Sequence, residues 1–347
     1  MEKEGKNIGI ALSGGGIRAT VFHLGVLKWL AEKGQMESIT KISTVSGGSL
    51  SIGLIYAHND QRWPSSEEFL KEVLPKVRRV LLTEDIQLKA LWKLVLSPWR
   101  WKQKVHVLAD TMAQHWGIRG VMTDLGKEPQ WYVNCTTFET GKRFRFCQED
   151  MGDYKMGYSK KPKIPVAEAM AASAGFPVLV GPYRLNTEHY VWEKPRFEDS
   201  DWDIKDNKYV HLWDGGVYDN LGLESVFKIE EGGTLRKGID HLIVSNAFAG
   251  NGYVKRKSDL AVKNLRRLLD IATDQVGALR TRSVMDFIFR TRKGVFLKIG
   301  NNGKDGDKTE AEYVKNYPTT LRKPTASDFD RILQHGYEVA RCNFFRD

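Results

Sequence analysis

The chain contains little cysteine and no long apolar stretch. Its 347 residues include 3 cysteines without CxxC spacing, which argues against a disulfide-stabilised secreted scaffold and fits a reducing compartment. No run approaches the ~18 apolar residues of a membrane-spanning helix. The segment Met1–Lys6 also lacks the apolar region of a signal peptide. We therefore expect a protein that is made and kept in the cytoplasm.

Metal-binding patterns are also missing. None of the 8 histidines stands at paired metal-ligand spacing. The acidic stretch Lys304–Asp307 offers only two carboxylates and lacks the spacing and the closing glutamate of a calcium-binding EF-hand loop. We expect no metal and no cofactor, and we expect function to survive a chelator.

The composition is that of an ordinary globular protein with a basic surface. Hydrophobic residues make up 41% and charged residues 28%, and 53 basic against 43 acidic residues leave a net charge of +10. Repeated strand and helix signals predict one α/β domain, residues 1–347, with a mostly parallel central sheet. A basic surface attracts anionic lipid headgroups. Nucleic acid is not expected as a partner, because no RNA- or DNA-binding motif is found.

Three consecutive glycines, Gly14–Gly16, occupy a predicted junction between a strand and a helix. The apolar run Ile8–Leu12 is typical of a buried strand, and apolar residues recur at near-helical spacing over Thr20–Lys33, with Gly34 as the C-terminal cap. Glycines let a ligand approach backbone amides, and the start of a helix adds positive potential. The junction is therefore suited to binding negative charge.

A second strand, turn and helix follow, with Ser46 at the turn. Ile42–Val45 predicts the strand, and apolar residues continue as a helix to about His58. This is the context of a G-x-S-x-G nucleophile elbow, except that Thr44 replaces the first glycine, where a β-branched residue should crowd the turn. The alternative is an ordinary flexible Gly/Ser turn.

Asp214 follows a third predicted strand, Tyr209–Trp213, and precedes two glycines. A carboxylate at such a strand end is well placed to act as a base, although an ordinary Asp-Gly turn is the alternative. An exposed aspartate, with a pKa of about 3.9, is a poor base at neutral pH. Burial among apolar neighbours such as Leu212 and Val217 would raise that pKa.

In this order, the glycine loop, Ser-x-Gly and Asp-Gly-Gly resemble the motifs of the patatin-like phospholipase family. The family reads G-G-G-x-R-G, G-x-S-x-G and D-G-G or D-G-A, so Ala19 departs from its final glycine. The small-residue segment Ala167–Pro177 and the C-terminal run Pro318–Arg322 are similar too. The resemblance implies a three-layer α/β sandwich. It also implies that Ser46 is the nucleophile and that Asp214 is the base. Gly14, Gly15, Gly16 and Gly47 would form the oxyanion hole, and Arg18 would brace the loop or bind substrate phosphate.

The implied activity is hydrolysis of fatty acyl esters of phospholipids or lysophospholipids by a serine–aspartate dyad. Neutral glycerides and thioesters remain open as substrates, and a silent or effector-controlled lipid-binding module on the same fold is the alternative of a different class. A Ser-His-Asp triad with His241 or His335 is a further alternative, whereas His23 is expected to pack in the first helix. A P-loop is remote, because no Gly-Lys-Ser/Thr follows the glycines.

Two segments mix aromatic and basic residues. Leu88–Lys102 lies within a predicted cap insertion at about residues 60–125, and Tyr154–Lys163 forms a basic loop. Tryptophan, lysine and leucine together suit a lipid interface, which predicts peripheral association with a phospholipid membrane. The alternatives are that Trp92, Leu94 and Leu96 pack the cap against the core, and that the second segment is a solvated surface. The oligomeric state cannot be predicted.

Overall fold

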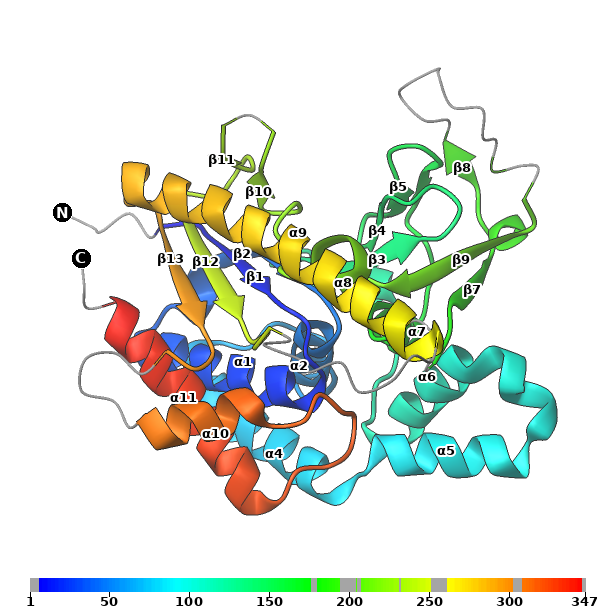
Figure 1. Ribbon diagram of the computed structural model, residues 1–347, viewed down its shortest axis with the longest axis horizontal. Coiled ribbons are helices and arrows are strands. Elements are labelled where there is room, and N and C mark those ends of the chain that lie inside the picture. The colour runs from blue at the N-terminus through cyan, green and yellow to red at the C-terminus, as the bar shows by residue number, and fades with distance from the viewer. Residues whose placement is uncertain are drawn as a thin grey trace.

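A sheet of 11 strands runs through the centre of the molecule in the computed structural model (Figure 1). The structure describes residues 6–175, 180–193, 204, 207–230, 232–250, 261–301 and 308–344. Parallel strands form the central part of the sheet, in the order β13 (Gly294–Lys298), β12 (His241–Asn246), β1 (Ile8–Leu12), β2 (Ile39–Thr44) and β3 (Gln130–Thr137). The predicted mostly parallel central sheet is confirmed here.

Antiparallel strands, which the sequence did not predict, extend the sheet beyond β3. They are β4 (Arg143–Phe146), β5 (Asp150–Asp153), β6 (Gly157–Lys160) and β8 (Trp192–Glu193). A branch of the same sheet contains β7 (Tyr183–Asn186) and β9 (Tyr209–Asp214), and β9 pairs with both β7 and β3. A separate hairpin joins β10 (Phe227–Lys228) to β11 (Thr234–Leu235).

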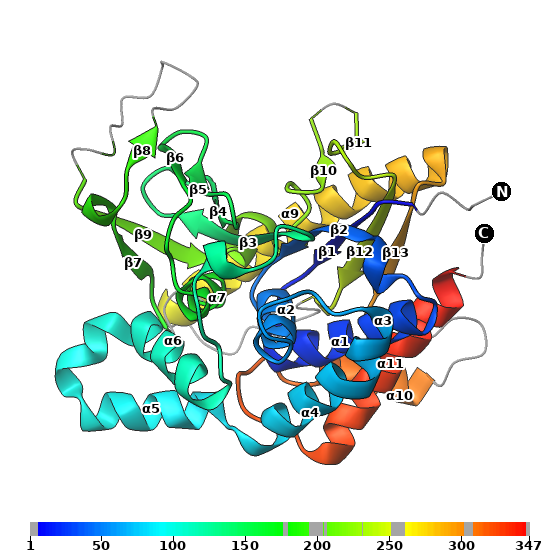
Figure 2. The ribbon, with the colours of Figure 1, turned by 180° about the vertical axis from the view of Figure 1, so that it is seen from behind.

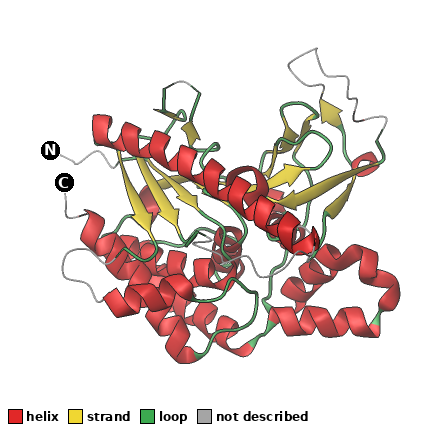
Figure 3. Ribbon diagram, in the orientation of Figure 1, coloured by secondary structure: helices red, strands yellow, loops and turns green. Residues whose placement is uncertain are grey.

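Helices cover both faces of the parallel strands, which confirms the three-layer α/β sandwich (Figure 3). Side chains alternate between the faces, since Ile10 packs in the larger core while its neighbour Ala11 packs in the smaller one. One face carries α1 (Gly16–Glu32), α2 (Gly47–Ala57), α4 (Leu74–Thr83), α10 (Lys308–Asn316) and α11 (Ala326–Phe344). The other carries the long helix α9 (Ala261–Thr291), seen in front in Figure 1.

The predicted elements around the motifs are present, with small shifts in their ends. The first helix begins at Gly16 rather than near Thr20, because Gly15 and Gly16 adopt positive φ values of 142° and 61° and start the helix within the glycine loop. Gly34 has a φ of 64° and follows the helix as predicted. The glycine loop is therefore part of the start of α1.

Residues 60–125 consist of two parts. The first contains α3 (Ser66–Glu68), the π-helical turn η2 (Phe69–Val73) and α4, and packs on α1, α2 and α11. The second contains α5 (Ile86–Leu96), the 3-10 helix η3 (Pro98–Gln103) and α6 (Lys104–His115), and α6 packs on α7 (Val166–Ser173). A capping role for this insertion stays a prediction. Within the described part of the chain, no helix is long and apolar enough to cross a bilayer.

Candidate active site

The carboxyl ends of β2 and β9 meet along one edge of β3. Strand β2 runs parallel to the first half of β3 and leaves it at the pair Thr44–Val133. Strand β9 runs antiparallel to the second half and ends at the pair Asp214–Cys135. Because β4 occupies the other edge of β3, both strands lie on the same edge and point toward each other. Ser46 and Asp214 are brought together in this way.

Ser46 stands in a strained turn between β2 and α2. Its φ of 48° and ψ of −116° are rare for a residue with a side chain, and such strain is typical of a nucleophile elbow. Its N–H donates to the hydroxyl of Ser173 at 3.0 Å, which holds the turn from α7. At Gly48, a Cβ atom would lie 2.4 Å from the carbonyl oxygen of Leu12, so a side chain is excluded there.

Thr44 does not crowd the turn as its β-branched side chain suggested. It is the last residue of β2, and its buried hydroxyl lies 2.9 Å from the hydroxyl of Ser49. The same oxygen accepts a hydrogen bond from Nε1 of Trp131 at 2.9 Å. The departure from the glycine of the motif is therefore accommodated, because polar partners surround the side chain.

Asp214 is buried, with 5% of its surface exposed. Its carboxylate accepts a hydrogen bond from the N–H of Gly216 at 2.8 Å, and the side chain of Ser46 lies next to it. Burial raises the pKa of Asp214 to about 7, although the Gly216 N–H and the Ser46 side chain both act to lower it. The carboxyl group is therefore half ionised near neutral pH and lies next to a serine hydroxyl.

The glycine loop packs directly on the turn that contains Ser46. A Cβ atom at Gly14 would lie 3.2 Å from Cβ of Ser46, and one at Gly47 would lie 2.3 Å from the carbonyl oxygen of Gly16. Within the described ranges, no acceptor contacts the N–H groups of Gly15, Gly16 and Gly47. These donors stand at the starts of α1 and α2, where positive potential favours an anion.

The N–H of Gly14, predicted to belong to the oxyanion hole, already has an acceptor. It donates to the carbonyl oxygen of Asn220 at 3.1 Å. A Cβ atom at Gly14 would also lie 2.4 Å from the Asn220 side-chain oxygen. Gly14 therefore ties the glycine loop to the segment that follows Asp214.

Arg18 points to the C-terminal segment of the chain. Its Nη1 donates to the carbonyl oxygens of Lys315, at 2.9 Å, and Tyr317, at 2.7 Å. The side chain is buried, and burial lowers its pKa to about 10. These contacts are those of a residue that braces the start of α1, which was one of the two roles predicted. Binding of substrate phosphate stays a prediction.

None of the histidines considered as a triad member contacts Ser46. His241 is the first residue of β12, which runs parallel to β1 and β2. It therefore lies at the amino ends of these strands, away from the carboxyl end of β2. The ring of His335 accepts a hydrogen bond from the N–H of Gly300 at 2.9 Å. His23 is fully buried and hydrogen-bonded to Ser13 and Ser245, as expected for a packing residue. Burial lowers the pKa of both His23 and His335 to about 4.

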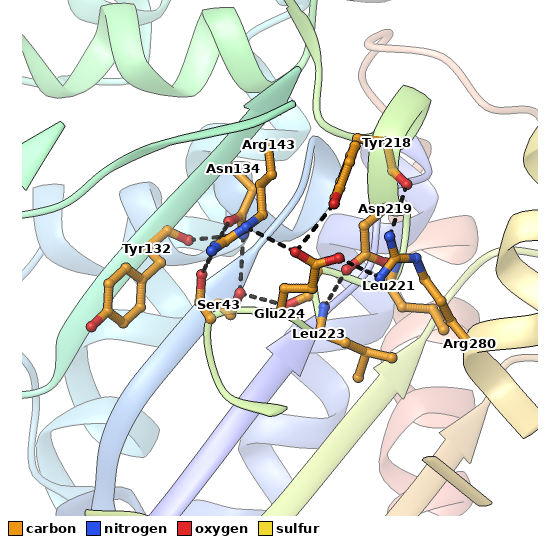
Figure 4. Close-up of polar contacts among 12 residues, drawn as sticks. Ser43, Tyr132, Asn134, Arg143, Tyr218, Asp219, Leu221, Leu223, Glu224 and Arg280 are labelled. Atoms are coloured by element: carbon orange, nitrogen blue, oxygen red, sulfur yellow. Dashed lines mark hydrogen bonds and ion pairs between the residues drawn. The ribbon is translucent and has the colours of Figure 1, made fainter. Parts of the chain in front are cut away.

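A buried network of charged residues behind the site was missed by sequence reasoning. Figure 4 shows Glu224 between Arg143 of β4 and Arg280 of α9, with ion-pair distances of 3.5 Å and 2.8 Å. Asn134 of β3 donates to the carbonyl oxygen of Thr44 at 2.9 Å and accepts from Arg143 at 3.1 Å. The network therefore joins the end of β2 to the segment after Asp214. Each residue alone is an ordinary polar residue, so no signal in the sequence identifies the set.

Two predictions concern residues that the structure does not describe. One is the acidic stretch 304–307. The other is that Phe176, Pro177 and Leu179, which lie at the end of the small-residue segment or just after it in the sequence, line an acyl pocket. Within the ranges that are described, no group of three or more histidine, cysteine, aspartate or glutamate side chains is arranged to hold a metal ion.

Comparisons with known proteins agree with this fold. The chain resembles the solved structure of human GIVD cytosolic phospholipase A2 with a TM-score of 0.57 and 13% identity. A second structure of that protein gives a TM-score of 0.53 and 13% identity. The match covers 99% of this chain in both cases, but this chain spans only 59% and 58% of those chains. At this identity the likeness shows the fold alone.

The family is shown by a second comparison. The model of the patatin-like phospholipases matches residues 10–227, which include the glycine loop, Ser46 and Asp214. This range is more than half of the 347 residues. The chain belongs to the patatin-like phospholipase family, a family of lipid acyl hydrolases.

Proposed function

We propose that this protein is a serine acyl hydrolase that releases fatty acids from phospholipids or lysophospholipids. One observation carries the proposal: the Ser46 side chain lies next to a buried carboxyl group, that of Asp214, whose pKa is about 7. A general base works best when its pKa lies near the working pH, so Asp214 suits proton removal from a serine at neutral pH without a histidine.

The reaction begins when Oγ of Ser46 attacks the acyl carbonyl carbon while Asp214 accepts the hydroxyl proton. The negative charge on the carbonyl oxygen is stabilised by the N–H groups of Gly15, Gly16 and Gly47, which need little reorganisation. Collapse of this tetrahedral intermediate breaks the ester bond, and the leaving alcohol takes the proton from Asp214. An acyl-enzyme remains on Ser46.

The second half of the reaction repeats these roles with water. Asp214, again ionised, accepts a proton from a water molecule that attacks the acyl-enzyme carbonyl. The new intermediate collapses, Ser46 leaves with the proton from Asp214, and the fatty acid is released. One water is consumed and one ester bond is cleaved.

The phospholipid substrate is inferred from the family match rather than from the geometry of the site. The human structural neighbour has been solved with the inhibitor methyl gamma-linolenyl fluorophosphonate. We propose that such a compound reacts here through attack of Ser46 Oγ on phosphorus, with loss of fluoride. Mass spectrometry should place the adduct on Ser46 in the wild type and find none on this peptide in Ser46→Ala.

The decisive experiment measures fatty-acid release from anionic phospholipid vesicles by wild type, Ser46→Ala and Asp214→Ala, with chelator present. A soluble short-chain ester is run in parallel. Release by the wild type alone would support both the dyad and the substrate class. Activity that survives both substitutions would refute the site.

The same assay distinguishes the other functions considered. Hydrolysis of only the soluble ester, lost in both variants, would retain the dyad and point to neutral glycerides or thioesters. No activity on any substrate, together with no fluorophosphonate adduct, would favour a silent or effector-controlled lipid-binding module.

A further inference from the structure

The apolar side of helix α5 faces solvent. Five exposed apolar residues of α5 and one of η3 repeat at the spacing of a single helix face: Leu88, Leu91, Trp92, Val95, Leu96 and Trp99. Trp92, Leu96 and Trp99 are 64%, 72% and 78% exposed. A helix on the surface of a globular protein normally turns such a face toward the core. We call these six residues the apolar stripe.

The opposite side of α5, which carries Lys89 and Lys93, is turned inward, toward α6. Lys89 lies 3.0 Å from Nδ1 of His115, and Lys93 donates to the side chain of Gln114 at 2.6 Å. His115 and Gln114 both belong to α6. Ile86, which is fully buried, and Ala90, which packs on the core, hold the helix from the same side, so exposure of the stripe follows from specific contacts. The alternative that Trp92, Leu94 and Leu96 pack the insertion against the core does not agree with the exposure of Trp92 and Leu96, whereas Leu94 is half-buried.

The side chains around the stripe are those of a lipid interface. Within the described residues, the exposed tryptophans are Trp92, Trp99 and Trp101, and all three lie in this segment. Residues 88–104 contain five basic and no acidic residues. Two of the basic side chains are already paired, Lys89 with Glu84 and Arg100 with Asp110. Lys102, in contrast, has no ion-pair partner among the described residues.

We propose that the apolar stripe, together with Trp101 and Lys102, docks on the surface of an anionic phospholipid bilayer. Tryptophan and leucine enter the headgroup and acyl boundary, while the basic side chains remain among the phosphates. This inference deepens the proposed function, on which it rests, by naming the surface from which the enzyme takes its substrate.

The stripe is connected to the candidate active site through two packed helices. Helix α5 packs on α6, α6 packs on α7, and Ser173 at the end of α7 accepts the N–H of Ser46. Figures 1 and 2 show α5 at the lower outer edge of the molecule and the β5–β6 hairpin near the top of the same side, with α6, β7 and β9 between them. The basic loop Tyr154–Lys163, which contains part of that hairpin, is therefore not part of this docking surface.

The test is vesicle co-sedimentation in the Ser46→Ala background, so that binding is measured without hydrolysis. The stripe variant Trp92→Ser/Leu96→Ser/Trp99→Ser should lower the partition coefficient on phosphatidylglycerol vesicles at least about tenfold. Phe289→Ser is the matched control, because Phe289 is 62% exposed on the distant end of α9. Lys102→Gln should weaken binding to these vesicles about fivefold and leave binding to phosphatidylcholine unchanged.

Catalysis separates this inference from the proposed function. With Ser46 intact, the stripe variant should retain hydrolysis of a soluble ester and lose hydrolysis of vesicles. Vesicle binding that equals wild type in the stripe variant would overturn the inference, even if hydrolysis by Ser46 is established. A wild-type dimer that the stripe variant converts to monomer, with vesicle binding unchanged, would assign the stripe to a second copy and also overturn it. If the protein binds vesicles through the stripe but hydrolyses no substrate, the proposed function is refuted and the docking surface is retained.

Discussion

Replacing Asp214 with asparagine should remove activity and, at the same time, stabilise the fold above neutral pH. Burial raises the pKa of this carboxyl group from 3.8 to about 7. Between these pH values the folded chain holds a proton that the unfolded chain has released, so stability falls as the pH rises. The loss is complete above about pH 7, where the folded chain contains a buried carboxylate.

The size of this effect follows from the pKa difference. A rise from 3.8 to about 7 corresponds to about 4 kcal/mol, at 1.36 kcal/mol for each pKa unit. Asparagine carries no charge and keeps a side-chain oxygen for the N–H of Gly216. For a chain of 347 residues the entropy of unfolding is about 0.7 kcal/mol per kelvin, so the variant should melt about 6 °C higher at pH 8.

Thermal unfolding of both proteins from pH 4 to pH 8.5 measures this directly. The difference in melting temperature should be near zero at pH 4, grow with pH and level off above about pH 7. Asp286→Asn, which removes an exposed carboxylate on α9, should show no comparable gain. The kcat/KM of the wild type should rise to a plateau above about pH 7, and Asp214→Asn should lower it by about 10²–10⁴-fold. A melting difference that does not change with pH would refute the reasoning.

Three further predictions follow from the contacts around the site. Arg18→Gln should lower the melting temperature, because the guanidinium binds backbone carbonyls and loss of these hydrogen bonds costs about 1–3 kcal/mol of stability. The KM for vesicle substrate should stay within about twofold of wild type. A large rise in KM at unchanged stability would instead support phosphate binding. Ser173→Ala should reduce kcat more than KM, since it removes the acceptor of the Ser46 N–H, whereas Ser51→Ala, a buried serine bonded within α2, should not. Hydrolysis should continue in excess EDTA, and activity that returns only with added calcium would contradict this expectation.

Local signals explain why several elements could be predicted from the sequence. Strand Ile8–Leu12 was predicted with its observed ends, because a short apolar run between polar segments is a strong strand signal. The turns at Ser46 and Asp214 were predicted from their neighbouring glycines. Glycine allows backbone conformations that other residues rarely adopt, and it allows other atoms to come close to the backbone. The proposed roles of Ser46 and Asp214 depended on the order of three motifs, all of which lie within the range that the family model matches.

Tertiary structure decided how these elements meet. The antiparallel half of the sheet depends on pairing between distant strands, and the meeting of β2 and β9 along β3 depends on their register. The supporting side chains, such as Ser173 and Asn134, act through partners far away in the chain. The bonded Gly14 amide could not be foreseen for the same reason.

Helix α5 shows the same division. Its sequence determined that one side is entirely apolar while the other carries Lys89 and Lys93, since this follows from spacing along a helix. Contacts of these lysines with α6, together with burial of Ile86, decided that the apolar side faces outward. The sequence by itself thus determined the local elements, the turn positions and the residues available for chemistry. Burial, register and the pairing of Ser46 with Asp214 were decided by the tertiary structure, because these properties depend on contacts between segments that are distant in the chain.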